Sequence, residues 1–241
     1  LLKEKKVEAV FSAGSTGATL ISAITILGKQ RGVIRPAIAS VLPTIERSVI
    51  LLDSGASLDV KPKVLYQFAV MGSKLAEALF DIESPKIGLL NNGEEESKGR
   101  ELEKSAFKLL NSSSLNFVGN VEGRDFATNK VDVFVTDGFT GNVVLKTLEG
   151  TAKLQQNLIS ASLKQNLFKP FLPSVKKALK PVKDQLNPDK TNASYLLGVD
   201  GLVTIGHGSS KQEAIMNGIQ YTNESINKDF IGKFSDAIKE L

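Results

Sequence analysis

The chain has 241 residues, of which 41% are hydrophobic and 23% are charged, with 20 glycines and 8 prolines. This composition is typical of a globular protein with a buried core, and it excludes a disordered, collagen-like or coiled-coil chain. The absence of cysteine excludes disulfides and thiol catalysis, and a single histidine excludes a multi-histidine metal site. The net charge of +4 is not the clustered excess of a nucleic-acid-binding protein.

Short β-branched segments alternate with longer segments of helical periodicity. The predicted strands are Val7–Phe11, Ala37–Leu42, Val49–Asp53, Lys86–Asn91, Leu115–Val118, Val131–Thr136 and Leu202–Ile205. The predicted helices are Gly17–Lys29, Pro62–Phe80, Glu95–Leu110, Gly141–Lys164, Ser174–Leu186, Lys211–Asn223 and Lys228–Leu241. The alternation predicts one α/β domain over residues 1–241, a three-layer α/β/α sandwich with a mostly parallel sheet. The PTIERS connection between the second and third strands is too short for a crossover, which favours an antiparallel pair there.

The first predicted strand leads into the small and polar loop SAGSTGA. Gly14 and Gly17 flank Ser15 and Thr16 at the start of a helix, where free backbone N–H groups can meet an anion. The loop has neither the lysine ending of a P-loop nor the GxGxxG spacing. A tight turn with a Ser or Thr cap is the simpler explanation of the same residues.

Two later loops carry charged residues after predicted strands. Asn91 is followed by the acidic run Glu94–Glu96, which favours the first turn of a helix, with a cation ligand as the less favoured alternative. Asn120 lies in the loop GNVEGRD together with Arg124. Arg124 can hold an anion through two N–H donors, or it can be neutralised by a neighbouring acid.

The loop DGFTGNVVLK predicts an anion site. Asp137 ends a strand, and Asn142 and Lys146 are four residues apart, so they share a helix face near a terminus that favours anions. A helix cap and a surface lysine would explain the same residues. His207 lies between two glycines and precedes Ser209, which makes it a better catalytic candidate than a lone structural histidine.

These loops are expected to meet in the folded chain. The carboxyl ends of the strands in a doubly wound sheet gather along one edge, where ligands bind. We therefore expect a single crevice lined by the loops at Gly14, Asn91, Asn120, Asp137 and His207.

Seven segments, in chain order, carry a resemblance to a known family. SAGSTGA, LLDSGAS, GLLNNGEEESKG, GNVEGRD, VTDGFTGNVVLKTLEG, YLLGVDG and GHGSS resemble the signature segments of the bacterial phosphate acyltransferase of phospholipid synthesis. The resemblance runs from about Val7 to Phe230. Two departures are Ser15, where the family usually has Asn, and Asn92, where Ile is usual. The family also has an N-terminal segment ahead of SAGSTGA, and we expect this chain to be a piece that lacks it.

The resemblance implies an enzyme that transfers a fatty acyl group from acyl-[acyl carrier protein] to inorganic phosphate, with no cofactor or metal. The acyl phosphate then feeds glycerol-3-phosphate acylation. It also implies a fold similar to that of phosphate acetyltransferases and isocitrate/isopropylmalate dehydrogenases. The candidate catalytic residues are Lys146, Asn142 and His207. The candidate substrate-binding and phosphate-binding residues are Gly14, Ser15, Thr16, Gly17, Asn91, Asn120, Arg124, Asp137 and Ser209.

Two other functions are open at this point. A metal-dependent decarboxylating dehydrogenase-like enzyme would need an Asp cluster for Mg²⁺ or Mn²⁺ and a nicotinamide site. Asp53, Asp125 and Asp137 are too scattered in the sequence to indicate one. A non-catalytic membrane-associated scaffold would retain lipid binding without turnover.

Residues 151–188 are predicted to form a protruding helical pair within the domain. Leucines and an isoleucine recur before a proline-rich break, and Val175, Leu179 and Val182 recur after it with lysines on the opposite face. We expect this apolar surface to pack against a second chain in a homodimer. The tip LFKPFLP combines apolar side chains with lysines, which predicts contact with an anionic membrane surface, unless the tip packs back on its own subunit.

The expected protein is therefore cytoplasmic and peripherally membrane-associated. Its expected partners are acyl-[acyl carrier protein], inorganic phosphate, a second copy of the chain and an anionic membrane surface. The downstream glycerol-3-phosphate acyltransferase is a further candidate partner, and no nucleic acid is expected.

Overall fold

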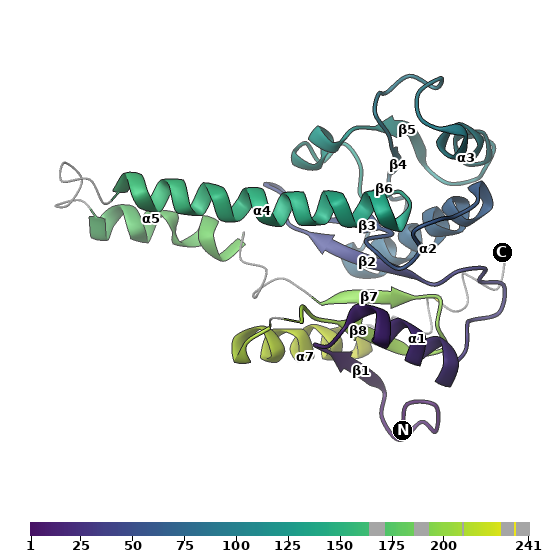
Figure 1. The fold of residues 1–241 in the computed structure, drawn as a ribbon, viewed down its shortest axis with the longest axis horizontal. Helices are drawn as coiled ribbons and strands as arrows, with labels where there is room; N and C mark the ends of the chain where they lie inside the picture. Colours follow the sequence, from purple (N-terminus) through teal and green to yellow (C-terminus); the bar gives the residue numbers. More distant parts are fainter. Residues whose placement is uncertain (164–171, 186–192, 209, 228–233, 235–241) are drawn as a thin grey trace.

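The structure of the chain is a computed structural model. It describes residues 1–163, 172–185, 193–208, 210–227 and 234. Its strands are β1 (Ala9–Ser12), β2 (Ala37–Leu42), β3 (Val49–Leu52), β4 (Ile87–Leu90), β5 (Phe117–Val121), β6 (Val133–Val135), β7 (Ser194–Leu197) and β8 (Leu202–Ile205). Its helices are α1 (Thr16–Ile26), α2 (Pro62–Phe80), α3 (Glu101–Asn111), α4 (Gly138–Leu163), α5 (Leu172–Gln185) and α7 (Gln212–Asn227). A 3₁₀ turn, η1, spans Gly123–Ala127 (Figure 1).

All eight strands belong to one sheet in the order β1-β8-β7-β2-β3-β6-β4-β5. The strands β3, β6, β4 and β5 run parallel to one another, as do β1 and β8, so the α/β prediction of a mostly parallel sheet is confirmed. The pairs β2–β3, β2–β7 and β7–β8 are antiparallel. The β2–β3 pairing confirms what the short PTIERS connection favoured.

The central strands are buried on both faces because their side chains alternate between two layers of helices. In β3, Ile50 and Leu52 join one apolar cluster, whereas Val49 and Leu51 join another. In β6, Phe134 lies on the same side as Val49 and Leu51. This alternation places the sheet between two helical layers, as the α/β/α prediction requires.

The two faces of the sheet are covered differently. On one face a single continuous cluster unites α2, α3 and α7, with Phe68, Leu110 and Tyr221 among its members. On the other face the apolar contacts divide into two clusters, one that includes Leu145 of α4 and one that includes Ala23 of α1. The space over β2 between these two clusters is where the site described below is found.

Prediction and structure differ most at one helix start and one strand, and a further predicted helix is not described. The helix predicted from Glu95 begins at Glu101, because Gly99 has a φ of +90°, outside the helical range, and Arg100 caps the helix. Strand β7 has no counterpart among the predicted strands. The predicted helix Lys228–Leu241 lies outside the described residues except for Phe234, which is buried.

The predicted helical pair corresponds to the distal part of α4 and to α5. Figure 1 shows both segments extending beyond the sheet. Leu154, Leu158, Ile159 and Val182 are exposed along them. The apolar tip, residues 167–173, falls mostly on residues that the structure does not describe. Within the described ranges, no helix is both long and apolar enough to cross a membrane.

Candidate active site

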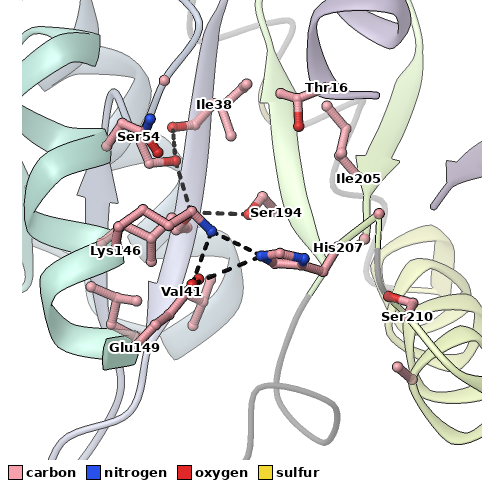
Figure 2. Close-up of a pocket in the computed structure, with 18 residues that line it drawn as sticks. Thr16, Ile38, Val41, Ser54, Lys146, Glu149, Ser194, Ile205, His207 and Ser210 are labelled. Atoms are coloured by element: carbon pink, nitrogen blue, oxygen red, sulfur yellow. Dashed lines mark hydrogen bonds and ion pairs between the residues drawn. The ribbon is translucent and has the colours of Figure 1, made fainter. Parts of the chain in front are cut away.

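A cavity of about 370 Å³ lies over β2, between α4 and the segments that follow β1 and β8 (Figure 2). Its polar lining residues are Thr16, Ser40, Ser54, Asn142, Lys146, Glu149, Ser194, His207 and Ser210. Its apolar lining residues are Ile38, Val41, Leu42, Leu145, Ile205 and Ala214, with Gly55, Gly206 and Gly208 completing the wall. Four of the sequence candidates, Thr16, Asn142, Lys146 and His207, therefore line one cavity.

Lys146 and His207 meet across this cavity although they are 61 residues apart in the chain. The Lys146 Nζ lies 2.8 Å from the His207 Nε2 and 2.9 Å from the Glu149 Oε2. The His207 Nε2 and the Glu149 Oε2 are 3.8 Å apart. The side chains of Lys146 and His207 are about half exposed (49% and 51%), whereas that of Glu149 is 25% exposed.

The geometry fixes the direction of the Lys146–His207 hydrogen bond. An ammonium group has only donors, so Lys146 donates and the Nε2 of His207 accepts. We therefore assign the ring proton of His207 to Nδ1. A cation that can bind an anionic oxygen thus lies beside a neutral imidazole that can exchange a proton, which is a combination suited to acyl or phosphoryl chemistry.

Two glycines at the start of α4 bring its functional face to the cavity. A Cβ at Gly141 would lie 1.9 Å from the Asp53 carbonyl oxygen, and one at Gly138 would lie 2.8 Å from backbone atoms of Ser57. Only residues without a side chain permit this close approach between the helix and the loop after β3. Asp137 caps the same helix, because its Oδ1 accepts the backbone N–H of Thr140 at 2.8 Å.

The loop after β3 is held by the buried carboxylate of Asp53. It accepts backbone N–H groups from Ile38, Gly55, Ala56 and Ser57 at 2.7–3.1 Å. Burial raises the pKa of Asp53, against the opposing effect of these four N–H donors. These hydrogen bonds hold the loop after β3 in place, and its Ser54 and Gly55 form part of the cavity wall.

Three serine hydroxyls form a directed chain along the floor of the cavity. Ser54 donates to the carbonyl oxygen of Ile38 at 3.0 Å, so its oxygen accepts from Ser40 at 2.7 Å. Ser40 has then used its only proton, so the 3.0 Å contact with Ser194 is donated by Ser194. The chain of hydroxyls joins β2, β7 and the loop after β3, and Figure 2 shows its two end residues, Ser54 and Ser194.

Most of the SAGSTGA loop forms a tight turn with a serine cap, which was the simpler of its two explanations. Ser15 caps α1 by accepting the N–H of Ala18 at 3.5 Å. Thr16 lines the cavity, whereas Gly14, Ser15 and Gly17 are not among its lining residues. A Cβ at Gly208 would lie 3.7 Å from the Gly14 carbonyl oxygen, so the loops after β1 and β8 are neighbours.

The prediction of one crevice for all five loops is wrong because of strand direction. Three successive antiparallel pairs separate β8 from β3, so β1 and β8 run opposite to the parallel set β3-β6-β4-β5. Their carboxyl ends therefore point in opposite directions, and the loop after β3 reaches the cavity through Ser54 and Gly55. The loops after β4, β5 and β6 do not line the cavity, and their candidates Asn91, Asn120, Arg124 and Asp137 are absent from its described lining residues.

These four candidates make structural contacts where they are. Asn91 donates to the Lys98 carbonyl oxygen at 3.2 Å, and Asn120 donates to the Glu95 carbonyl oxygen at 2.8 Å, so both hold the loop after β4. Arg124 pairs with Glu122, as the alternative explanation expected. Arg100 bridges Asp137 and Glu103, which ties the start of α3 to the start of α4, and these acids raise the pKa of Arg100. Ser209 lies outside the described residues.

The sequence candidates omit five polar residues of the cavity, Ser40, Ser54, Glu149, Ser194 and Ser210. Glu149 is three residues beyond Lys146, and this helical spacing could have indicated the pair. Ser40 interrupts an apolar strand, which is a weaker signal. Ser194 gave no signal, since its strand was not predicted. In the part of the chain that the structure describes, no group of three or more His, Asp or Glu side chains is arranged to hold a metal ion.

Comparison with known sequences identifies close relatives. The sequence model of a family described as "Fatty acid synthesis protein" matches residues 1–233. The chain is 42% identical over 248 residues to the phosphate acyltransferase of Elusimicrobium minutum, covering 100% of this chain and 71% of that protein. It is 43% identical over 244 residues to the phosphate acyltransferase of Dictyoglomus turgidum, covering 100% of this chain and 73% of that protein.

Comparison with solved structures supports the fold. The EutD phosphotransacetylase from Staphylococcus aureus aligns with a TM-score of 0.57 at 14% identity, over 100% of this chain and 66% of that chain. A branched-chain phosphotransacylase from Enterococcus faecalis V583 aligns with a TM-score of 0.59 at 13% identity, over 94% of this chain and 76% of that one. At these identities the likeness concerns the fold alone, and a likeness to isocitrate/isopropylmalate dehydrogenases stays a prediction.

Proposed function

Since the chain belongs to the phosphate acyltransferase family and is an acyltransferase, we propose that it transfers a fatty acyl group from acyl-[acyl carrier protein] to inorganic phosphate in the cavity of Figure 2. The observation that carries this assignment is the contact of Lys146 with His207 and Glu149 on the wall of the cavity. It combines a cation, a titratable imidazole and an adjoining apolar surface, which are the groups that the reaction needs.

Phosphate is bound by Lys146 in this proposal. The ammonium group has three N–H donors, of which one contacts Glu149 and one contacts His207. The third is available to a phosphate oxygen. Asn142 lies one turn earlier on the same helix and also lines the cavity, so its amide can donate to the carbonyl oxygen of the thioester.

The reaction requires no covalent enzyme intermediate. A phosphate oxygen attacks the thioester carbonyl carbon, a new C–O bond forms, and the negative charge moves to the carbonyl oxygen. The C–S bond then breaks, and the carrier thiolate takes up the proton that phosphate gives up. Holding the two reactants together and stabilising the oxyanion supply the rate enhancement, with Lys146 binding the phosphate and Asn142 donating to the oxyanion.

His207 is proposed to carry the proton between the two substrates. Its Nε2 accepts a hydrogen bond from Lys146, so this nitrogen has no proton to give in the resting state. Uptake of the phosphate proton at Nε2 breaks that hydrogen bond and produces an imidazolium. The imidazolium can then protonate the departing thiolate and return to its resting form.

The apolar part of the cavity is suited to the acyl chain. Val41 and Leu42 of β2, Leu145 of α4 and Ile205 of β8 lie on its walls. Burial of methylene groups against such side chains stabilises binding by about 0.8 kcal/mol for each group. This lining supports a fatty acyl substrate over a small one.

The test is an assay of acyl-[acyl carrier protein] with and without inorganic phosphate. We expect free carrier thiol and acyl phosphate in equal amounts, the latter trapped with hydroxylamine, and neither product without phosphate. Thiol release that does not depend on phosphate would contradict the proposed reaction. Absence of turnover in a chain that binds lipid vesicles would favour the non-catalytic scaffold. Reduction of a nicotinamide cofactor that needs Mg²⁺ or Mn²⁺, without thiol release, would favour the dehydrogenase-like alternative.

The helical arm, defined as the distal part of α4 with α5, is proposed to be the homodimer interface. Leu154, Leu158 and Ile159 are 58%, 58% and 43% exposed, a continuous apolar stripe at helical spacing. A second copy of the same stripe, related by a two-fold axis, would cover it. Changing Leu154 and Leu158 to glutamate should convert a dimer into a monomer in analytical ultracentrifugation, whereas a monomer before mutation would contradict the proposal.

Peripheral membrane association of a cytoplasmic enzyme is proposed for the tip of the arm. The sequence LFKPFLP and the lysines of α5 support contact with an anionic membrane surface, where a downstream glycerol-3-phosphate acyltransferase could receive the product. Changing Phe168, Phe171 and Leu172 to serine should release the protein from anionic vesicles and leave the dimer intact. Unchanged vesicle binding by this triple variant would contradict the membrane role.

A further inference from the structure

The cavity holds an unexpected negative charge for an anion-binding site. Among its described lining residues, Lys146 is the only cation and Glu149 is the only acid, while His207 is neutral in the arrangement described above. The Glu149 Oε2 accepts from Lys146 at 2.9 Å, whereas its Oε1 accepts no hydrogen bond from any described residue. The formal charge of the three side chains together is zero, so attraction by net charge alone does not explain how an anion binds there.

A carboxylate beside an anion is favourable only if the anion brings its own proton. An ionised carboxylate accepts hydrogen bonds and donates none, so an unprotonated oxyanion placed against it is repelled. Inorganic phosphate at neutral pH retains at least one proton and can donate a P–O–H hydrogen bond. Sulfate has the same tetrahedral shape but is fully deprotonated at this pH.

We propose that Glu149 selects phosphate over sulfate and other unprotonated tetrahedral anions by accepting the P–O–H hydrogen bond at its Oε1. The inference rests on the proposed function, because it assigns the phosphate to the same cavity. In the bound ground state the remaining N–H of Lys146 donates to an unprotonated oxygen of phosphate, while Glu149 accepts from the protonated one. The same proton passes to the neighbouring Nε2 of His207 when the phosphate oxygen attacks the thioester. The donor and the acceptor side by side match the two kinds of oxygen on hydrogen phosphate.

The test compares the inhibition constant for sulfate with the KM for phosphate in the wild type, in Glu149→Gln and in Glu101→Gln. Glutamine keeps the size of the side chain and adds N–H donors that can contact sulfate. We expect sulfate to be a poor inhibitor of the wild type. The inhibition constant for sulfate divided by the KM for phosphate should fall by about tenfold or more in Glu149→Gln. A ratio corrects for any general loss of anion affinity caused by a displaced Lys146.

Glu101→Gln is the matched control. Its carboxylate is 91% exposed on α3 and lies 3.6 Å from Lys104, away from the cavity. An exposed ion pair of this kind contributes little to folding stability, and it does not touch the cavity. We therefore expect the ratio to stay within about twofold of the wild type. Effective sulfate inhibition of the wild type, or an unchanged ratio in Glu149→Gln, would overturn the inference.

Equilibrium titration of inorganic phosphate and of sodium sulfate gives the same ratio without turnover. It separates the two proposals, since a wild type that binds phosphate but shows no phosphate-dependent thiol release contradicts the proposed function alone. Equal affinity for the two anions, or no phosphate binding, would overturn the role of Glu149. If Glu149→Gln does not fold, the wild-type titration still decides the outcome.

Discussion

The two faces of the sheet differ in how completely they are packed. The face under α2, α3 and α7 is one continuous apolar cluster. The opposite face has two clusters separated over β2, and the cavity occupies the gap. On that face Ser40 and Lys146 stand where apolar side chains would close the core. The comparison indicates that the continuous face supplies stability, whereas the interrupted face gives up packing for a site.

The first prediction concerns the continuous face. Phe68 of α2 is fully buried there, so Phe68→Ala leaves a large cavity in the core. We expect the free energy of unfolding to fall by about 3–5 kcal/mol, measured by urea denaturation. The molecules that remain folded should keep the KM for phosphate, because Phe68 is remote from the lining residues. A lowered affinity for phosphate would contradict the claim that stability and phosphate binding belong to different faces of the sheet.

The second prediction concerns the junction between α4 and the loop after β3. In Gly141→Ala the new Cβ would clash with the Asp53 carbonyl oxygen, so the helix or the loop must move. We expect a loss of about 3 kcal/mol in unfolding free energy and a loss of activity in the folded fraction. Gly150→Ala is the control, since nothing lies within 4 Å of a Cβ at that position of the same helix. Similar stabilities for the two variants would contradict the described packing.

The third prediction tests the anchor of that loop. Asp53→Asn replaces one accepting oxygen with an N–H₂ group that faces backbone N–H donors. We expect the unfolding free energy to fall by about 2 kcal/mol. Thermal denaturation would measure the change. An unaltered melting temperature would show that Asp53 does not hold the loop.

The smallest effect is expected on the cavity floor. Ser40→Ala removes the central hydroxyl of the serine chain, leaving Ser54 and Ser194 without their shared partner. We expect a change of about 1 kcal/mol in unfolding free energy, since water can replace a hydroxyl that borders a cavity. A loss as large as that of Phe68→Ala would mean that the floor belongs to the packed core after all.

Local pattern predicted the elements well. Ala37–Leu42, Pro62–Phe80 and Leu202–Ile205 have the predicted bounds, because their apolar periodicity and flanking residues are local properties. Strand β7 was missed because Ser194–Leu197 is short and follows the proline-rich stretch. The direction of β8 could not be predicted, since it depends on which distant strands pair.

The sequence predicted individual residues of the candidate site, but it did not predict how they lie relative to one another. Asn142, Lys146 and His207 each stood out through their local sequence. That Lys146 and His207 touch depends on which distant strands pair, and Asn91 and Asn120 lie outside the described lining of the same cavity. Position after a strand does not by itself indicate proximity, since Ser54 after β3 shares the cavity with His207 after the oppositely directed β8.

The central claim is that the contact of Lys146 with His207 and Glu149 is the catalytic centre of acyl transfer to phosphate. The most direct test measures kcat and KM for phosphate in Lys146→Ala beside Lys104→Ala, with a thermal melt of each. Lys146 is about half exposed, so its loss should leave the melt nearly unchanged while phosphate-dependent turnover falls by about 100-fold or more. Lys104→Ala, which changes an exposed lysine on α3, should retain both. Wild-type turnover in Lys146→Ala would contradict the account.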